Sequence, residues 1–109
     1  MKWEINYSVR ALEDLKAIYE YIAFKLLASE TASGQVKRIM DSISRLDEMP
    51  LMYKAYEEEP WKSEGLRVFS VDKYVVLYLP KKDQKIVNIV RIIYGGRDIK
   101  KQLSETDDI

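Results

Sequence analysis

Five basic and aromatic side chains in the C-terminal half carry most of the chemistry that this sequence offers. They are Arg67, Lys73, Arg91, Tyr94 and Arg97. Cleavage of RNA through its 2′-hydroxyl needs a base for that proton, a clamp for the phosphate charge and an acid for the leaving oxygen. Arginine suits the clamp, because its planar guanidinium binds phosphate oxygens in pairs. The set points either to phosphate chemistry or to binding of an acidic partner.

Histidine and cysteine are both absent from the 109 residues. Their absence removes the usual general base, the thiol nucleophile and the commonest zinc ligands. A site that cleaved RNA would have to draw its acid and base from Tyr, Lys or carboxylates, and the loop residues Glu57, Glu58 and Glu59 supply a run of the last. We expect no cofactor and no metal, and we expect most familiar hydrolase mechanisms to be excluded.

Each candidate residue also has a purely structural explanation. Arg91 stands among apolar residues, where an arginine is as often ion-paired or snorkelling as it is a ligand. Tyr94 is more often a core aromatic than an acid, and the run of three glutamates is more often a solvated loop.

Arg97 with Asp98 has the further explanation of a charge pair at a helix start, but Gly95-Gly96 before it would let the backbone approach a phosphate or a partner closely. We therefore rank Arg97 first as a functional residue, then Arg91 and Arg67.

The formal net charge is zero, from 18 basic and 18 acidic residues, but its distribution is uneven. Residues 60–103 hold 10 basic and 4 acidic side chains, a net charge of +6, which attracts nucleic acid or acidic proteins but is also ordinary for a solvated sheet edge. No apolar run approaches the roughly 18 residues of a membrane span, and the first residues have neither the basic start nor the apolar stretch that we would expect of a signal peptide. We expect a cytoplasmic protein with no membrane partner.

The N-terminal half predicts a strand followed by two helices. Trp3, Ile5 and Tyr7 alternate with polar residues, as in a half-buried strand. Apolar residues then recur at helical spacing over residues 9–27. A second helix, with Ser29 or Thr31 as its cap, follows to Pro50; its seam is heptad-like and needs a neighbouring helix, as in an antiparallel hairpin over residues 9–48. The seam consists of Ala32, Val36, Ile39, Ile43 and Leu46.

The C-terminal half predicts an antiparallel meander of three strands. Residues 66–71, 74–79 and 86–94 have strand composition and are separated by polar turns. Asp98 can cap a short helix through Leu103, and we expect residues 103–109 to be a frayed acidic tail. The predicted fold class is α+β, a single domain over residues 1–109 with an antiparallel sheet and a helical hairpin on one face.

Both faces of the last two strands are apolar, although two helices can cover only one of them. We expect the other face to be buried by a partner, because a large exposed apolar patch marks an interaction surface. The alternative is that this face packs on the loop over residues 50–65.

Five segments of the sequence resemble one family, in order and in spacing. They are residues 7–22, 46–50, 65–67, 73–78 and 90–99. Together they are similar to the RelE/ParE toxin superfamily over essentially residues 5–103, and the predicted order of elements agrees with that family's fold. The resemblance implies the toxin of a type II toxin–antitoxin pair, held inactive in a hetero-oligomer by a small cognate antitoxin that wraps around it.

The superfamily has two branches, and this sequence is closer to the ParE-like one. RelE-like toxins cut messenger RNA on the ribosome and usually carry an arginine where this chain has Val75, and an essential tyrosine or histidine where it has Leu103. The segment 94–98 is closer to the ParE form, whose members poison DNA gyrase. The resemblance thus implies gyrase as the target, with ribosome-dependent mRNA cleavage by a metal-independent endoribonuclease, or a degenerate non-toxic binding module, as alternatives. In this resemblance Arg97 matches a basic residue that the family has just after its last strand. With Arg91, Arg67 and Tyr94, chosen above for their chemistry, it makes up the candidate site.

Overall fold

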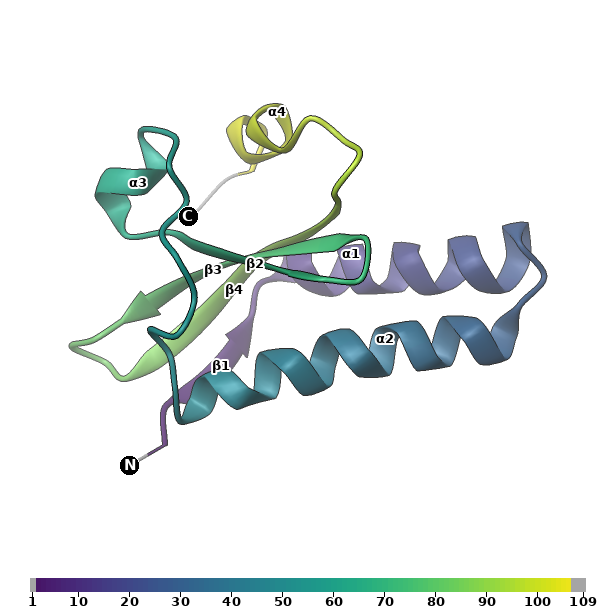
Figure 1. The fold of residues 1–109 in the computed structure, drawn as a ribbon, viewed down its shortest axis with the longest axis horizontal. Coiled ribbons are helices and arrows are strands. Elements are labelled where there is room, and N and C mark those ends of the chain that lie inside the picture. The colour runs from purple at the N-terminus through teal and green to yellow at the C-terminus, as the bar shows by residue number, and fades with distance from the viewer. Residues whose placement is uncertain (1, 107–109) are drawn as a thin grey trace.

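The alternating and helical patterns of the sequence produce a four-stranded sheet with a helical hairpin on one face and two short helices on the other (Figure 1). The structure, a computed structural model, describes residues 2–106. Within these residues no helix is long and apolar enough to cross a membrane. The elements are β1 (Glu4–Tyr7), α1 (Val9–Glu20), a π-helix η1 (Tyr21–Lys25), α2 (Ser29–Ser44), a 3-10 turn η2 (Arg45–Asp47), α3 (Trp61–Glu64), β2 (Arg67–Val71), β3 (Tyr74–Lys81), β4 (Ile86–Tyr94) and α4 (Ile99–Ser104).

The α+β class and the three-stranded meander are confirmed, but the sheet is mixed rather than antiparallel throughout. Its order is β1-β4-β3-β2, and β1 runs parallel to β4 with Glu4 opposite Ile86 and Tyr7 opposite Ile89. Alternation along β1 predicts a strand but says nothing of its direction. No tight turn fixes that direction, because the whole helical hairpin and the other two strands separate β1 from β4.

The helical hairpin forms and extends beyond the sheet (Figure 1), but the first helix, predicted over residues 9–27, is α-helical only to Glu20 and continues as the π-helix η1. Four seam residues, Ala32, Ile39, Ile43 and Leu46, are fully buried against the sheet and α1. The predicted caps are wrong: the left-handed turn at Leu27 (φ 53°) makes Ala28 the N-cap of α2, and it offers no side-chain hydrogen bond.

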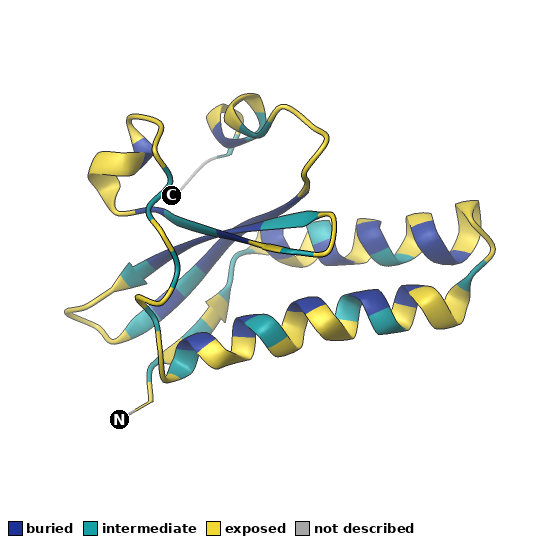
Figure 2. Cartoon of the chain, in the orientation of Figure 1, coloured by how far each residue is buried: buried dark blue, intermediate teal, exposed yellow. Residues whose placement is uncertain are grey.

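The second face of the sheet is covered by the chain itself. Leu77, Leu79, Val90 and Ile93 are at most 5% exposed and pack with residues from α3, α4 and the loop before β2. Figure 2 shows these buried strands between the two layers of helices. The expectation that an outside partner must cover this face is therefore wrong. Packing on segment 50–65 is the alternative that the structure shows, with α4 as a second cover.

The helix α4 begins as predicted, with the Asp98 carboxylate accepting a hydrogen bond from the Lys101 amide. The predicted frayed tail is wrong for its first four residues. Leu103 is 1% exposed, and the Thr106 hydroxyl accepts a hydrogen bond from Arg91 Nη1 at 3.0 Å. The rest of that tail, residues 107–109, lies outside the described residues.

The carboxylate of Asp14 links α1 to the part of the β4 edge that does not pair with β1. Asp14 accepts hydrogen bonds from Arg91 Nε at 2.8 Å, from Arg91 Nη2 at 2.9 Å and from the Ile92 amide at 2.9 Å. Both ends of the ion pair are nearly buried, with 6% of the Arg91 side chain and 14% of the Asp14 side chain exposed. Ser8 continues this contact by donating its hydroxyl to the Val90 carbonyl.

We predict that Asp14→Ala lowers the free energy of unfolding by about 3–5 kcal/mol, because it leaves the Arg91 guanidinium buried without its counter-charge. Urea unfolding measures this difference. The control is Asp41→Ala, which removes the partner of an exposed i,i+4 pair with Lys37 and should cost less than about 0.5 kcal/mol. Equal losses in the two variants would contradict the assignment.

Candidate functional site

Two of the four candidate residues are used by the fold. Arg91 takes the ion-paired alternative described above, and its remaining donors point to α4, where Nη1 contacts the Gln102 carbonyl and Thr106. Arg67 donates from Nη1 to the backbone carbonyls of Leu51 and Tyr53, which fixes the loop before α3. In both guanidinium groups, N–H donors that could bind a ligand are already bonded within the chain.

The other two candidates lie together at one end of the sheet, Tyr94 as the last residue of β4 and Arg97 in the turn that follows. Tyr94 is 45% exposed, and its carbonyl accepts a hydrogen bond from the Arg97 amide at 3.0 Å. The Gly95 amide donates to the Lys73 carbonyl at 2.8 Å, which ties this turn to the β2–β3 turn. Within residues 2–106, the exposed side chains of Arg97 and Lys73 form no hydrogen bond or ion pair.

Three tyrosines lie close to one another at this end of the sheet. The rings of Tyr74 and Tyr94 meet edge to face, with centroids 5.9 Å apart and an interplanar angle of 67°. Burial, and after it the neighbouring hydroxyls of Tyr94 and Tyr21, raise the pKa of Tyr74 above its usual range. We call Tyr21, Lys73, Tyr74, Tyr94 and Arg97 the sheet-end surface.

An exposed polar network holds the β2–β3 turn, and hence Lys73, against α2. The Asp72 carboxylate accepts hydrogen bonds from Arg38 Nε and Gln35 Nε2, each at 2.9 Å. The bond from Arg38, and then that from Gln35, hold the pKa of Asp72 below its usual range. Asp72 itself has a φ of 54°, in the left-handed region that aspartate tolerates better than most residues.

Two of the three loop carboxylates, those of Glu57 and Glu59, bind residues of α3 that follow them closely in sequence. Glu59 accepts hydrogen bonds from the Ser63 amide and hydroxyl, and Glu57 pairs with Lys62 at 3.2 Å. These contacts are typical of a solvated helix start, so the loop supplies no evident base to the sheet-end surface.

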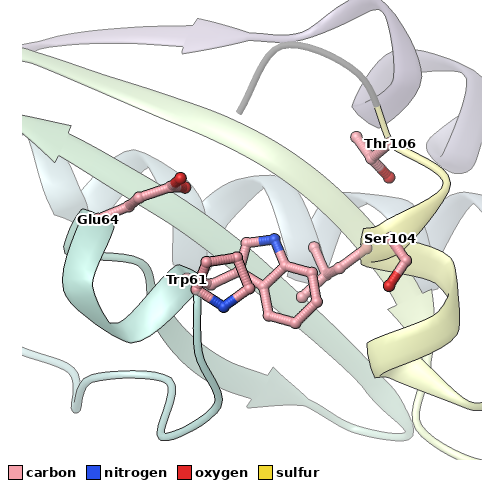
Figure 3. A pocket seen from close by; sticks show the side chains of 6 residues that line it. Trp61, Glu64, Ser104 and Thr106 are labelled. Atoms are coloured by element: carbon pink, nitrogen blue, oxygen red, sulfur yellow. The ribbon is translucent and has the colours of Figure 1, made fainter.

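A shallow pocket of about 400 Å³ opens between α3 and α4 on the second face of the sheet (Figure 3). Trp61 and Leu103 are both nearly buried in its wall, while Glu64, Ser104 and Thr106 supply its polar atoms. Among the described residues no three His, Cys, Asp or Glu side chains gather where they could hold a metal ion. One carboxylate and two hydroxyls do not form a nucleophile with an adjacent base.

The sheet-end surface suits binding better than proton transfer. Its tyrosine with the raised pKa stays protonated at neutral pH and acts as a donor, and its two cations supply positive charge. Sequence reasoning proposed Tyr94 and Arg97, which lie on this surface, but not Tyr74 or Tyr21, and it did not predict Asp14 as the partner of Arg91. From the sequence pattern, Asp14 is one of several polar residues on a predicted helix. Tyr74 is an aromatic residue in a predicted strand, so neither pattern indicates a special role.

A family model described as the ParE toxin of the type II toxin–antitoxin system parDE matches residues 5–99. No curated protein gives a significant sequence match.

Three solved structures share the fold. The chromosomal ParDE toxin–antitoxin system from P. aeruginosa gives a TM-score of 0.70 at 22% identity, over 85% of this chain and 96% of that one. The toxin–antitoxin complex RelBE2 from Mycobacterium tuberculosis gives 0.58 at 18% identity, over 86% and 99%. A mutant of the E. coli toxin RelE in the free state gives 0.67 at 12% identity, over 97% and 95%. At these identities the likeness is one of fold.

We predict that Tyr94→Phe lowers the pKa of Tyr74 toward, but not to, its ordinary value, because burial is the larger cause and stays in place. Tyr21→Phe should act in the same direction. NMR titration of the tyrosine ring resonances measures the change. An unchanged pKa of Tyr74 in both variants would show that the three hydroxyls do not form one cluster.

Proposed function

Since this chain belongs to the ParE toxin family of type II toxin–antitoxin systems, we propose that it inhibits bacterial growth by binding DNA gyrase, and that a cognate antitoxin keeps it inactive in a hetero-oligomer. The observation that carries the gyrase target is the sheet-end surface itself. It presents free cations and tyrosine hydroxyls without a general base beside them. A surface of this kind binds a partner and leaves the chemistry to the enzyme that it inhibits.

Two further features support binding rather than RNA cleavage. Position 75, next to Tyr74, is a valine, so the surface has no second arginine to hold a phosphate there. The one arginine within β4, Arg91, is neutralised by Asp14. A ribonuclease without histidine would need groups shifted far from reference pKa values of about 4 or 10. The shift seen at Tyr74 is upward, which moves it away from a role as base.

The antitoxin partner is supported by the family and by the two related assemblies, which are toxin–antitoxin systems in their own right. Co-expression of the chain with the product of a small adjacent gene, followed by purification of the complex, tests this part of the proposal. A chain that purifies alone and arrests growth equally with or without that product would contradict it.

We predict that Arg97→Ala and Lys73→Ala each weaken growth inhibition and inhibition of gyrase supercoiling by about tenfold or more, roughly the loss of one charged contact. The matched control is Lys82→Ala. Lys82 is exposed in the turn after β3, at the end of that strand opposite Lys73, and its loss should leave both activities unchanged.

The same purified protein decides between the alternatives. Degradation of naked RNA that is lost in Arg97→Ala would establish catalysis, and codon-linked mRNA cuts on induction would establish the ribosome as the target. A chain that leaves growth unaffected would be a non-toxic binding module.

A further inference from the structure

The turn from Tyr94 to Arg97 contains a glycine that has no room for a side chain. A Cβ built on Gly96 would lie 2.5 Å from Tyr94 Cε2, 3.2 Å from Cδ2 and 3.4 Å from Cζ. Gly96 does not have the positive φ that favours glycine; among the described glycines only Gly65 does. A side chain at position 96 would therefore push the exposed Tyr94 ring out of its present position.

This contact limits where the Tyr94 ring can lie, and hydrogen bonds of the same turn fix the backbone of Arg97. The Tyr94 ring is held between Gly96 and the edge-on ring of Tyr74. Arg97 follows Gly96 directly, and its amide bonds to the Tyr94 carbonyl. A Cβ on Gly95 would meet the Lys73 carbonyl at 3.2 Å, so the turn also sits closely on the β2–β3 turn. The exposed tyrosine ring and the backbone that carries the two cations are thus preorganised, which lowers the entropy cost of binding.

The charge of the sheet-end surface indicates the kind of partner. Lys73 and Arg97 are exposed cations, and the nearest carboxylate in sequence to each is already used, Asp72 by Arg38 and Gln35, and Asp98 by the Lys101 amide. Tyrosine and arginine are also the residues most enriched among the binding hot spots of protein interfaces. Two cations beside three tyrosines fit an acidic protein segment better than a nucleic acid, whose binding is dominated by many phosphate contacts.

We infer that the sheet-end surface is a preformed docking surface for an acidic segment of the protein target, and that Gly96 is the positioning residue that shapes it by holding the Tyr94 ring. This inference rests on the proposed growth-inhibiting function but does not require gyrase to be the target. Gly96 touches no partner itself and acts only through Tyr94.

The test compares Gly96→Ala with Gly34→Ala. Gly34 lies in α2, where an added Cβ would meet only Arg38 Nη1 at an ordinary 3.5 Å, so it controls for the change of residue type. Growth inhibition on induction and affinity for the gyrase holoenzyme are measured for both, with the melting temperature as a check on folding. We expect Gly96→Ala to lose at least tenfold in both activities while keeping the melting temperature, and Gly34→Ala to keep wild-type activity.

A coupled variant separates positioning from a structural role. In the Tyr94→Ala background the ring is gone, so adding Gly96→Ala should change affinity by less than twofold, measured at concentrations where the residual binding of Tyr94→Ala is detected. A tenfold further loss there, or full activity of Gly96→Ala alone, would overturn the inference.

A DNA duplex, used as a second probe, tests whether the sheet-end surface binds an acidic protein segment or nucleic acid. We expect the wild-type chain to leave a duplex unbound when gyrase is absent. Binding to that duplex, weakened by Arg97→Ala, would replace the acidic protein segment with nucleic acid. A chain that arrests growth without binding gyrase would contradict the proposed target, whereas the growth assay on Gly96→Ala would still decide the role of the turn.

Discussion

The carboxylate of Asp14 is the point at which the two halves of this protein meet. From Ile86 to Ile89 the backbone of β4 is paired with β1 along this edge. Beyond Ile89 the strand β1 has ended, and it no longer supplies partners to β4. The Asp14 carboxylate then accepts hydrogen bonds from the Ile92 amide and from Nε and Nη2 of Arg91. The Ser8 hydroxyl donates a hydrogen bond to the Val90 carbonyl. An unpaired edge and a buried guanidinium would each destabilise the fold. Asp14 bonds both to the β4 edge and to the buried Arg91 guanidinium. Because Arg91 also contacts the end of α4, these bonds orient α1, β4 and α4 relative to one another.

This arrangement determines which basic residues are left for function. Because Arg91 is bound to Asp14 and to the end of α4, it anchors the cover of the second sheet face. Arg67 holds the loop that leads into the other part of that cover. The basic excess of the C-terminal half is therefore partly structural, and the free charge of interest lies at the sheet end with Lys73 and Arg97.

Local pattern predicted the elements well, because periodicity depends only on neighbouring residues. The limits of β4 agree with the sequence expectation, as does the Asp98 cap of α4. Apart from the N-cap of α2, what failed depends on contacts that are distant in sequence. The partner of Arg91 is 77 residues away, and the cover of the second face comes from segment 50–65, which has no period to detect. The role of Gly96 depends on where one aromatic ring lies, which no spacing in the sequence encodes.

The proposed function requires that the sheet end, rather than the pocket between α3 and α4, contacts the target. Amide hydrogen exchange of the chain, alone and saturated with gyrase, tests this requirement. We expect slower exchange at residues 73–75 and 94–97 in the complex, with exchange at residues 61–66 and 99–104 unchanged. Protection confined to the latter two segments, with the turn after β4 exchanging as in the free chain, would contradict it.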